Sequence, residues 1–158
     1  MGKHLVESFK LLRGAEPKSY SGAAMADAYV SLKNYQTLTI KICTGAWAGG
    51  TAAVTLSQAT AIAGTSAKAL AFTDYWDDLT TTGTLAKKAA TSNTFNLGTA
   101  NKSFVIHVDA NMLDAAGGFD CVTLAVASPG ANADFYSVEY ILSDARYQQA
   151  TPPSALVD

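Results

Sequence analysis

The chain has 158 residues, of which 49% are hydrophobic and only 15% are charged, and its formal net charge is −2. This length fits one domain that buries roughly two thirds of its unfolded surface, so it needs neither a disulfide nor a metal to fold. The slightly negative charge argues against nucleic-acid binding. A charged fraction well below the ordinary value of about 25% suits close packing against other subunits.

The N-terminal part of the chain is basic and the remainder is acidic. Six basic and three acidic residues up to Lys41 give +3, and the five basic and ten acidic residues after it give −5. A basic arm on an acidic body is suited to docking on that body or on an acidic partner, although scattered solvated charges give the same totals. Met1–Leu12 lacks the apolar core of a signal peptide, and no run approaches about 18 apolar residues. We therefore expect a soluble protein that is made in the cytoplasm and does not contact a membrane.

Residues 3–12 alternate in a way that fits either a helix or a strand. Pro17 follows soon after and cannot donate to a strand ladder, so we interpret this region as an extended arm or an edge strand. The N-terminal arm and loop are expected to cover residues 1–28. Deletion of residues 1–16 is expected to weaken partner binding while the remaining body stays folded.

The clearest strand pattern lies in residues 36–59. Leu38, Ile40 and Ile42 alternate with polar residues, and Val54 and Leu56 do the same further on. This period of two is typical of half-buried strands. Three glycines in residues 44–50 allow the chain to reverse. The pattern predicts a β-hairpin between the two strands, with Trp47 at its tip.

Further short strands follow, separated by turn signals, and no long helix is expected. A helical turn is expected near residues 112–116. The sequence predicts seven to nine strands in all, and hence an all-β fold made of a single antiparallel β-sandwich with extended N- and C-terminal arms. Jelly-roll connectivity is our first choice. The sandwich is expected at residues 29–147 and an extended tail at 148–158. The expected later strands are 67–72, 84–90, 94–97, 102–109, 119–127 and 135–143.

No recognised catalytic motif is present: the chain lacks a nucleophile elbow, a phosphate-binding loop and a zinc-protease motif. His107 lies mid-strand on an outward position, which is more typical of packing or an interface than of a catalytic base. We expect no enzyme activity, no catalytic residue and no cofactor, and we keep a small hydrolase only as a formal alternative.

Asp74, Asp77 and Asp78 form an acidic cluster of the kind that can act as general acid and base or bind calcium. Asp77 and Asp78 are adjacent in an extended segment, so their carboxylates point to opposite sides, which disfavours both roles. Residues 109–114 resemble part of a calcium loop but lack its glycine and distal glutamate, so we interpret them as an Asx-rich turn. Cys43 and Cys121 belong to no metal-binding pair, and two buried reduced thiols are the default expectation. We therefore expect no metal site.

Trp47, Tyr75 and Trp76 form the most conspicuous aromatic group. They fit an aromatic platform for a sugar, a cap on the end of the sandwich, or burial against a neighbouring subunit, where aromatic residues concentrate. The last two interpretations are favoured over the sugar site.

Five segments of the chain resemble small virion proteins of tailed bacteriophages, and specifically capsid decoration or cement proteins. The resemblance runs in order through residues 30–147 and rests on Val30–Tyr35, Thr44–Thr60, Ala69–Trp76, Gly118–Cys121 and Tyr140–Tyr147. It implies a protein at the virion capsid surface, made in the host bacterial cytoplasm, that binds the expanded capsid lattice. Its implied partners are the major capsid protein and copies of itself, commonly as a trimer.

The resemblance transfers no catalytic or contact residues, so the candidate interface comes from the residues themselves. The alternative function is a carbohydrate-binding head-fibre or tail accessory module of a phage particle. The candidate capsid or subunit interface residues are Leu5, Phe9, Lys10, Arg13, Trp47, Tyr75 and Trp76.

Overall fold

The computed structural model describes residues 8–26, 28–79, 83–147 and 154–156. Within these residues most of the chain is in strands, and the helices are limited to two short 3-10 turns. None of the described helices is long and apolar enough to cross a membrane. The elements are β1 (Phe9–Ser19), β2 (Val30–Ser31), β3 (Tyr35–Thr44), β4 (Ala52–Ala59), β5 (Lys68–Ala69), β6 (Asp74–Leu79), β7 (Thr84–Ala89), β8 (Thr94–Leu97), β9 (Ser103–Asp109), η2 (Ala110–Met112), η3 (Ala115–Gly117), β10 (Cys121–Val126) and β11 (Phe135–Ala145).

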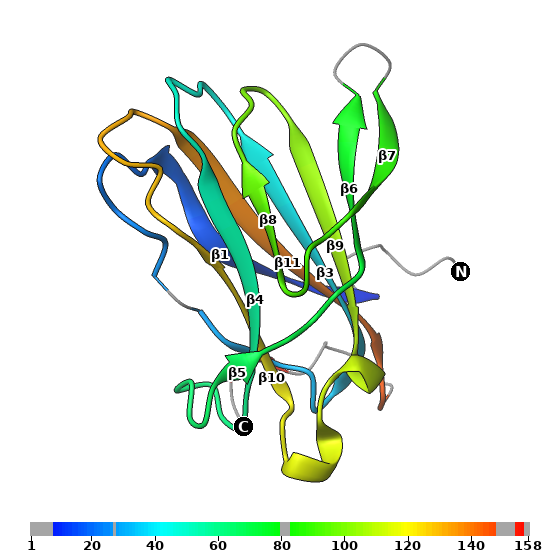
Figure 1. Cartoon of the computed structure of the whole chain (residues 1–158). Coiled ribbons are helices and arrows are strands. Elements are labelled where there is room, and N and C mark those ends of the chain that lie inside the picture. Colours follow the sequence, from blue (N-terminus) through cyan, green and yellow to red (C-terminus); the bar gives the residue numbers. More distant parts are fainter. Residues whose placement is uncertain (1–7, 27, 80–82, 148–153, 157–158) are drawn as a thin grey trace.

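The strands form two packed antiparallel sheets (Figure 1). Sheet A has the order β1-β11-β3-β9-β6-β7, and sheet B has the order β2-β10-β4-β5, with β8 also paired to β4. The pairing is nested: the first strand pairs with the eleventh, the second with the tenth, the third with the ninth and the fourth with the eighth. A nested hairpin that is rolled into two sheets is a jelly roll, so the expected antiparallel sandwich is confirmed.

Alternating apolar side chains from both sheets fill the space between them. In β3, Leu38, Ile40 and Ile42 are each 0% exposed, as the period-two pattern predicts. Sheet B contributes the equally buried Leu124, whose backbone N–H donates a hydrogen bond of 3.1 Å to the Tyr140 hydroxyl of β11. This bond crosses the core and links the two sheets.

The predicted β-hairpin in residues 36–59 is wrong. Both segments are strands, but β3 belongs to sheet A and β4 to sheet B, so their connection crosses between the sheets. Alternation and glycines indicate two strands joined by a reversal, but they do not indicate that the strands pair with each other. The crossing requires glycine at Gly50, where φ is +76° and a Cβ would lie 2.9 Å from the Pro129 carbonyl oxygen.

Two later segments also differ from the predictions. Residues 74–79, which the sequence pattern does not mark as a strand, form β6 and pair with β7 and β9. The alternation of β6 is hidden because Asp77, a charged residue, occupies a buried position. The expected strand at residues 67–72 is reduced to the two residues of β5.

Residues 9–19 form an edge strand of sheet A, which is one of the two interpretations offered for this region. β1 pairs with β11 from Phe9 to Ser19, so the sandwich begins well before residue 29. The register shifts at Gly14, where a Cβ would lie 2.9 Å from the ring of Tyr140. Deletion of residues 1–16 would remove most of β1 and destabilise sheet A, so the expectation that the body stays folded is wrong.

The described part of the C-terminal tail packs against sheet B. Ala155 is 0% exposed, and its carbonyl oxygen accepts a hydrogen bond of 2.9 Å from the backbone N–H of Ser31 in β2. The other residues of the expected tail, 148–153 and 157–158, lie outside the described residues.

Candidate interaction surface

The outward side of sheet A is a broad surface made by the side chains that alternate with the buried ones. Residues directly opposite each other in antiparallel strands share a face, so the register of β3 places its neighbours on the same side. We call this surface the sheet-A face. Its members include Phe9, Leu11 and Arg13 of β1; Phe135, Ser137, Glu139, Ile141 and Ser143 of β11; Thr37, Thr39, Lys41 and Cys43 of β3; Ser103, Val105 and His107 of β9; Asp74 and Trp76 of β6; and Lys87 of β7.

Apolar side chains are distributed over the whole sheet-A face. Leu11 is 55% exposed and Phe135 is 43% exposed, although both are large hydrophobic residues. Ile141, Val105 and Trp76 are half-buried by their neighbours in the sheet. Apolar groups that are left in contact with water over several adjacent strands indicate an interaction surface.

The two lysines of the sheet-A face each lie beside a carboxylate of the same face. Lys41 Nζ is 3.8 Å from Glu139 Oε2, which is directly opposite in β11. Lys87 Nζ is 2.9 Å from Asp74 Oδ2 and 5.9 Å from the ring centre of Trp76. The hydrogen bond from Lys87 is the main reason why the pKa of Asp74 lies below its usual value. Exposed pairs of this kind add little stability, but they leave the charges of the face largely balanced.

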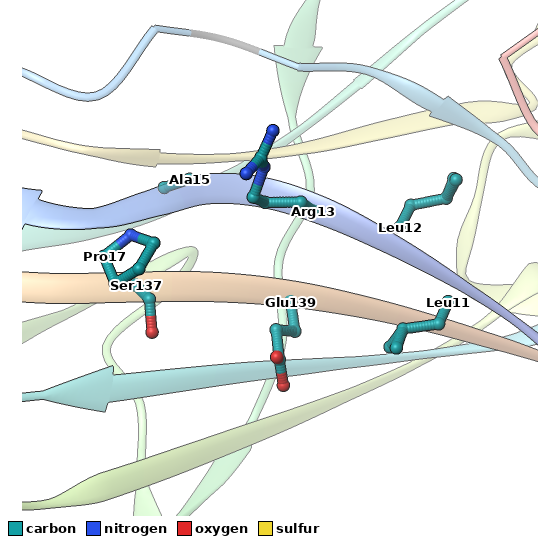
Figure 2. Close-up of a pocket in the computed structure, with 7 residues that line it drawn as sticks. All are labelled: Leu11, Leu12, Arg13, Ala15, Pro17, Ser137 and Glu139. Atoms are coloured by element: carbon teal, nitrogen blue, oxygen red, sulfur yellow. The ribbon is translucent and has the colours of Figure 1, made fainter.

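An open groove follows the seam between β1 and β11 (Figure 2). Its volume is about 410 Å³, and Leu11 lies at one end while Pro17 and Ser137 lie at the other. A second hollow of about 250 Å³ continues from Pro17 and Ser137 to Phe135. Both ends of the combined groove are apolar, and Glu139 lies between them. The residues lining the two hollows are Leu11, Leu12, Arg13, Ala15, Pro17, Cys43, Thr44, Gly45, Phe135, Tyr136, Ser137 and Glu139.

The sequence-derived interface residues are only partly brought together. Phe9, Arg13 and Trp76 lie on the sheet-A face. Lys10 is half-buried and lies opposite Leu142, a core residue, so it is on the inward side of β1. Leu5 lies outside the described residues.

Trp47 and Tyr75 point elsewhere, so the three aromatic residues do not form one platform. Tyr75 points inward and stacks on Phe95, with ring centres 4.0 Å apart, whereas the next residue, Trp76, points outward. Burial raises the pKa of Tyr75. Trp47 packs against the core in the crossing between β3 and β4, where its Nε1 donates a hydrogen bond of 3.1 Å to the Gly50 carbonyl oxygen.

Asp77, Asp109 and Asp114 have structural roles. Asp77 points inward and its Oδ2 accepts a hydrogen bond of 3.0 Å from Lys102 Nζ, with the two side chains 11% and 19% exposed respectively. Asp109 and Asp114 cap η2 and η3, which confirms the predicted Asx-rich turn. Among the described residues, no group of three or more His, Cys, Asp or Glu side chains is placed to hold a metal ion.

Asp134 is a buried carboxylate that sequence reasoning missed. It is 0% exposed, and its Oδ1 accepts hydrogen bonds from the backbone N–H groups of Ala48 and Gly49. These bonds fix the crossing that carries Trp47. The residues before Asp134 are typical of a turn, so nothing in the local pattern marks this position as buried.

Cys43 and Cys121 lie on the outward sides of different sheets and are not joined in a disulfide. Cys121 is fully buried, whereas Cys43 is half-buried on the sheet-A face.

His107 is exposed on the sheet-A face, opposite Thr39, at the outward position that the sequence indicated.

Fold and surface together define an antiparallel jelly-roll sandwich in which the described residues leave the sheet-A face open. No family model matches the chain, and no curated protein matches it. Among solved structures, the SPBc2 prophage-derived protein YomS is similar over 86% of this chain and 93% of its own, with 15% identity and a TM-score of 0.47. The coat protein of Tobacco streak virus is similar over 96% of each chain, with 8% identity and a TM-score of 0.37.

A structure of the infectious bursal disease virus Gx strain is similar over 85% of this chain and 39% of its own, with 12% identity and a TM-score of 0.26. All three proteins come from viruses or a prophage. At these identities and TM-scores, the similarities carry no argument about what this chain binds.

Proposed function

We propose that the chain is a structural protein of a phage particle, which binds the outer surface of the expanded capsid and stabilises it. In this proposal its partners are the major capsid protein and further copies of the same chain, arranged as a homotrimer. It acts by binding and not as an enzyme, and it uses no cofactor, nucleic acid or membrane. It is made in the cytoplasm of the host bacterium and resides on the virion capsid surface.

The observation that carries this proposal is the open sheet-A face. It is broad, it is apolar in several places, and its lysines are paired with carboxylates of the same face. Such a surface suits contact with another protein surface better than capture of a small molecule, whose sites are concave and enclosed. The resemblance of residues 30–147 to phage decoration proteins supports the choice of a capsid as the partner.

Stabilisation follows from selective binding. A protein that binds the expanded lattice and not its precursor shifts the equilibrium towards the expanded state by mass action. At a free concentration 100 times Kd, each bound copy contributes about 2.7 kcal/mol. A jelly roll suits this role because its nested pairing ties distant parts of the chain together.

The test is binding to two kinds of shell from the phage that encodes the chain. Purified protein is mixed with expanded shells and with unexpanded precursor shells, and co-sedimentation is measured. We expect binding to expanded shells alone and a higher melting temperature of the decorated shells. Equal binding to both kinds, or binding to neither, would contradict the proposal. Light scattering of the free protein is expected to give the mass of a trimer.

The alternative of a carbohydrate-binding module loses its main support. It relied on a platform of Trp47, Tyr75 and Trp76, and these side chains lie in three different environments. A glycan-binding screen with a Trp47→Ala control is the direct measurement, and we expect no signal above background.

A further inference from the structure

We propose that the sheet-A face is the surface that seats on the capsid, an inference that rests on the proposed function. The occupant is the outer surface of the expanded lattice. From the chemistry of the face, we expect the contacted lattice surface to be close to neutral and lined by hydroxyl and apolar side chains.

The sheet-A face has about the area that a specific interface needs. Six strands spaced about 4.8 Å apart, with about seven paired residues each at 3.3 Å per residue, span a projected area of roughly 650 Å². Specific interfaces bury about 800 Å² on each partner, and the accessible area of side chains exceeds their projected area. The face can therefore supply a complete interface without help from the sheet edges.

The charges of the sheet-A face allow it to be covered. Lys41 is paired with Glu139 and Lys87 with Asp74, so covering the face leaves neither lysine without a carboxylate partner. A covered lysine without a partner would make contact strongly unfavourable. The third cation of the face, Arg13, lies 3.9 Å from Glu16 of its own strand. Because all three pairs are internal to the chain, seating requires no charged group from the lattice, and binding is expected to depend only weakly on salt.

The composition of the face favours a separately assembled partner over a permanent second copy. Hydroxyl groups are spread among its apolar residues, from Thr37 and Thr39 in β3 to Ser137 and Ser143 in β11. Obligate homodimer interfaces are larger and more hydrophobic than this surface. A preformed shell is a separate partner of the kind that a mixed polar and apolar face of moderate area fits.

Part of the outward face of sheet B is covered by the chain itself and cannot contact a partner. Cys121 and Thr123 of β10 are 0% and 1% exposed. The backbone N–H of Ala28 donates a hydrogen bond of 3.2 Å to the Thr123 hydroxyl, and Ala155 is buried beside β2. Segments of the chain itself already cover this part of sheet B.

The test compares one substitution at matched positions of the two sheets. Thr39→Arg places a long cation in the middle of the sheet-A face, and Thr55→Arg places the same group on the outward side of β4 in sheet B. Both positions are half-buried in strands. Leu11→Asp at the exposed edge of the sheet-A face is a second variant that β1 can accommodate. Thermal melting establishes that each variant is folded, and binding is measured with expanded shells of the encoding phage.

We expect Thr39→Arg and Leu11→Asp to weaken shell binding at least tenfold, while Thr55→Arg binds like the unchanged protein. Wild-type affinity is expected to change less than threefold between low and moderate salt. If both sheet-A variants bind expanded shells normally, the inference is wrong although the proposed function stands. If they instead change the mass of the free protein by light scattering, the face belongs to a second copy and the inference is also wrong. If the unchanged protein does not bind expanded shells, the proposed function itself fails.

Discussion

Thr39 and Thr123 occupy comparable outward positions in the middle of β3 in sheet A and β10 in sheet B. Thr39 is half-buried and belongs to an open face, whereas Thr123 is 1% exposed. The difference comes from the segment between β1 and β2, which crosses sheet B. Met25 donates a backbone hydrogen bond of 2.9 Å to Val126, and Ala28 donates one of 3.2 Å to the hydroxyl of Thr123.

This difference shows how the chain uses its residues outside the strands. The segment before β2 and residues 154–156 are packed on sheet B, so that sheet has much of its outward side completed within the chain. The sheet-A face has no comparable cover among the described residues, although it exposes Leu11 and Phe135. The sheet-A face is therefore the surface on which we expect the proposed partner to bind.

The largest expected effect is a loss of stability when a lysine on the inward side of sheet A is replaced. A lysine on the outward side serves as the comparison. Lys102→Met leaves the inward carboxylate of Asp77 without its cation, and we expect the free energy of unfolding to fall by about 3 kcal/mol. Lys41→Met removes a lysine that is 42% exposed beside Glu139, and we expect a loss below about 1 kcal/mol. Urea unfolding of both variants gives the comparison. Equal losses would mean that the inward and outward sides do not differ in the way described.

The next largest expected effect is the difference in stability cost between an arginine on the covered outward side of sheet B and one on the open sheet-A face. Thr123→Arg forces a charged side chain beneath the segment that covers β10, and we expect it to cost about 2–3 kcal/mol. Thr39→Arg keeps its charge in water, and we expect a change within about 1 kcal/mol. Thermal melting followed by circular dichroism measures both. A tolerated Thr123→Arg would show that the cover on sheet B is weakly attached.

In the strands with clear alternation, the residues that face the core could be predicted from the sequence. Leu38, Ile40 and Ile42 alternate with polar residues and are all buried, as the pattern required. The jelly-roll class followed from many short strands and turn signals. The pairing of β3 with β9 could not be predicted, because both strands have the same alternation and nothing local distinguishes a distant partner from the neighbouring β4.

The open face could be predicted only in part. Leu38-Thr39-Ile40 and Val122-Thr123-Leu124 have the same local pattern, yet only the second threonine is covered. Coverage depends on where distant segments cross the sheets, which periodicity does not encode. β6 was missed for a related reason, since the inward position of Asp77 is stabilised by Lys102, a residue of another segment.

The smallest expected effect concerns the reactivity of the two thiols, and it involves no change in the stability of the protein. Cys43 is half-buried on the sheet-A face, with its Sγ 3.8 Å from the Ser103 hydroxyl, while Cys121 is fully buried on sheet B. We expect iodoacetamide to alkylate Cys43 in the folded protein and Cys121 only when the sheet opens, since a buried thiol reacts through local unfolding. Mass spectrometry of peptides after timed labelling separates the two sites.

Equal labelling of the two cysteines in the free protein would show that the two outward faces are equally open. The same measurement on decorated shells locates the partner, because slower labelling of Cys43 there would place it on the sheet-A face.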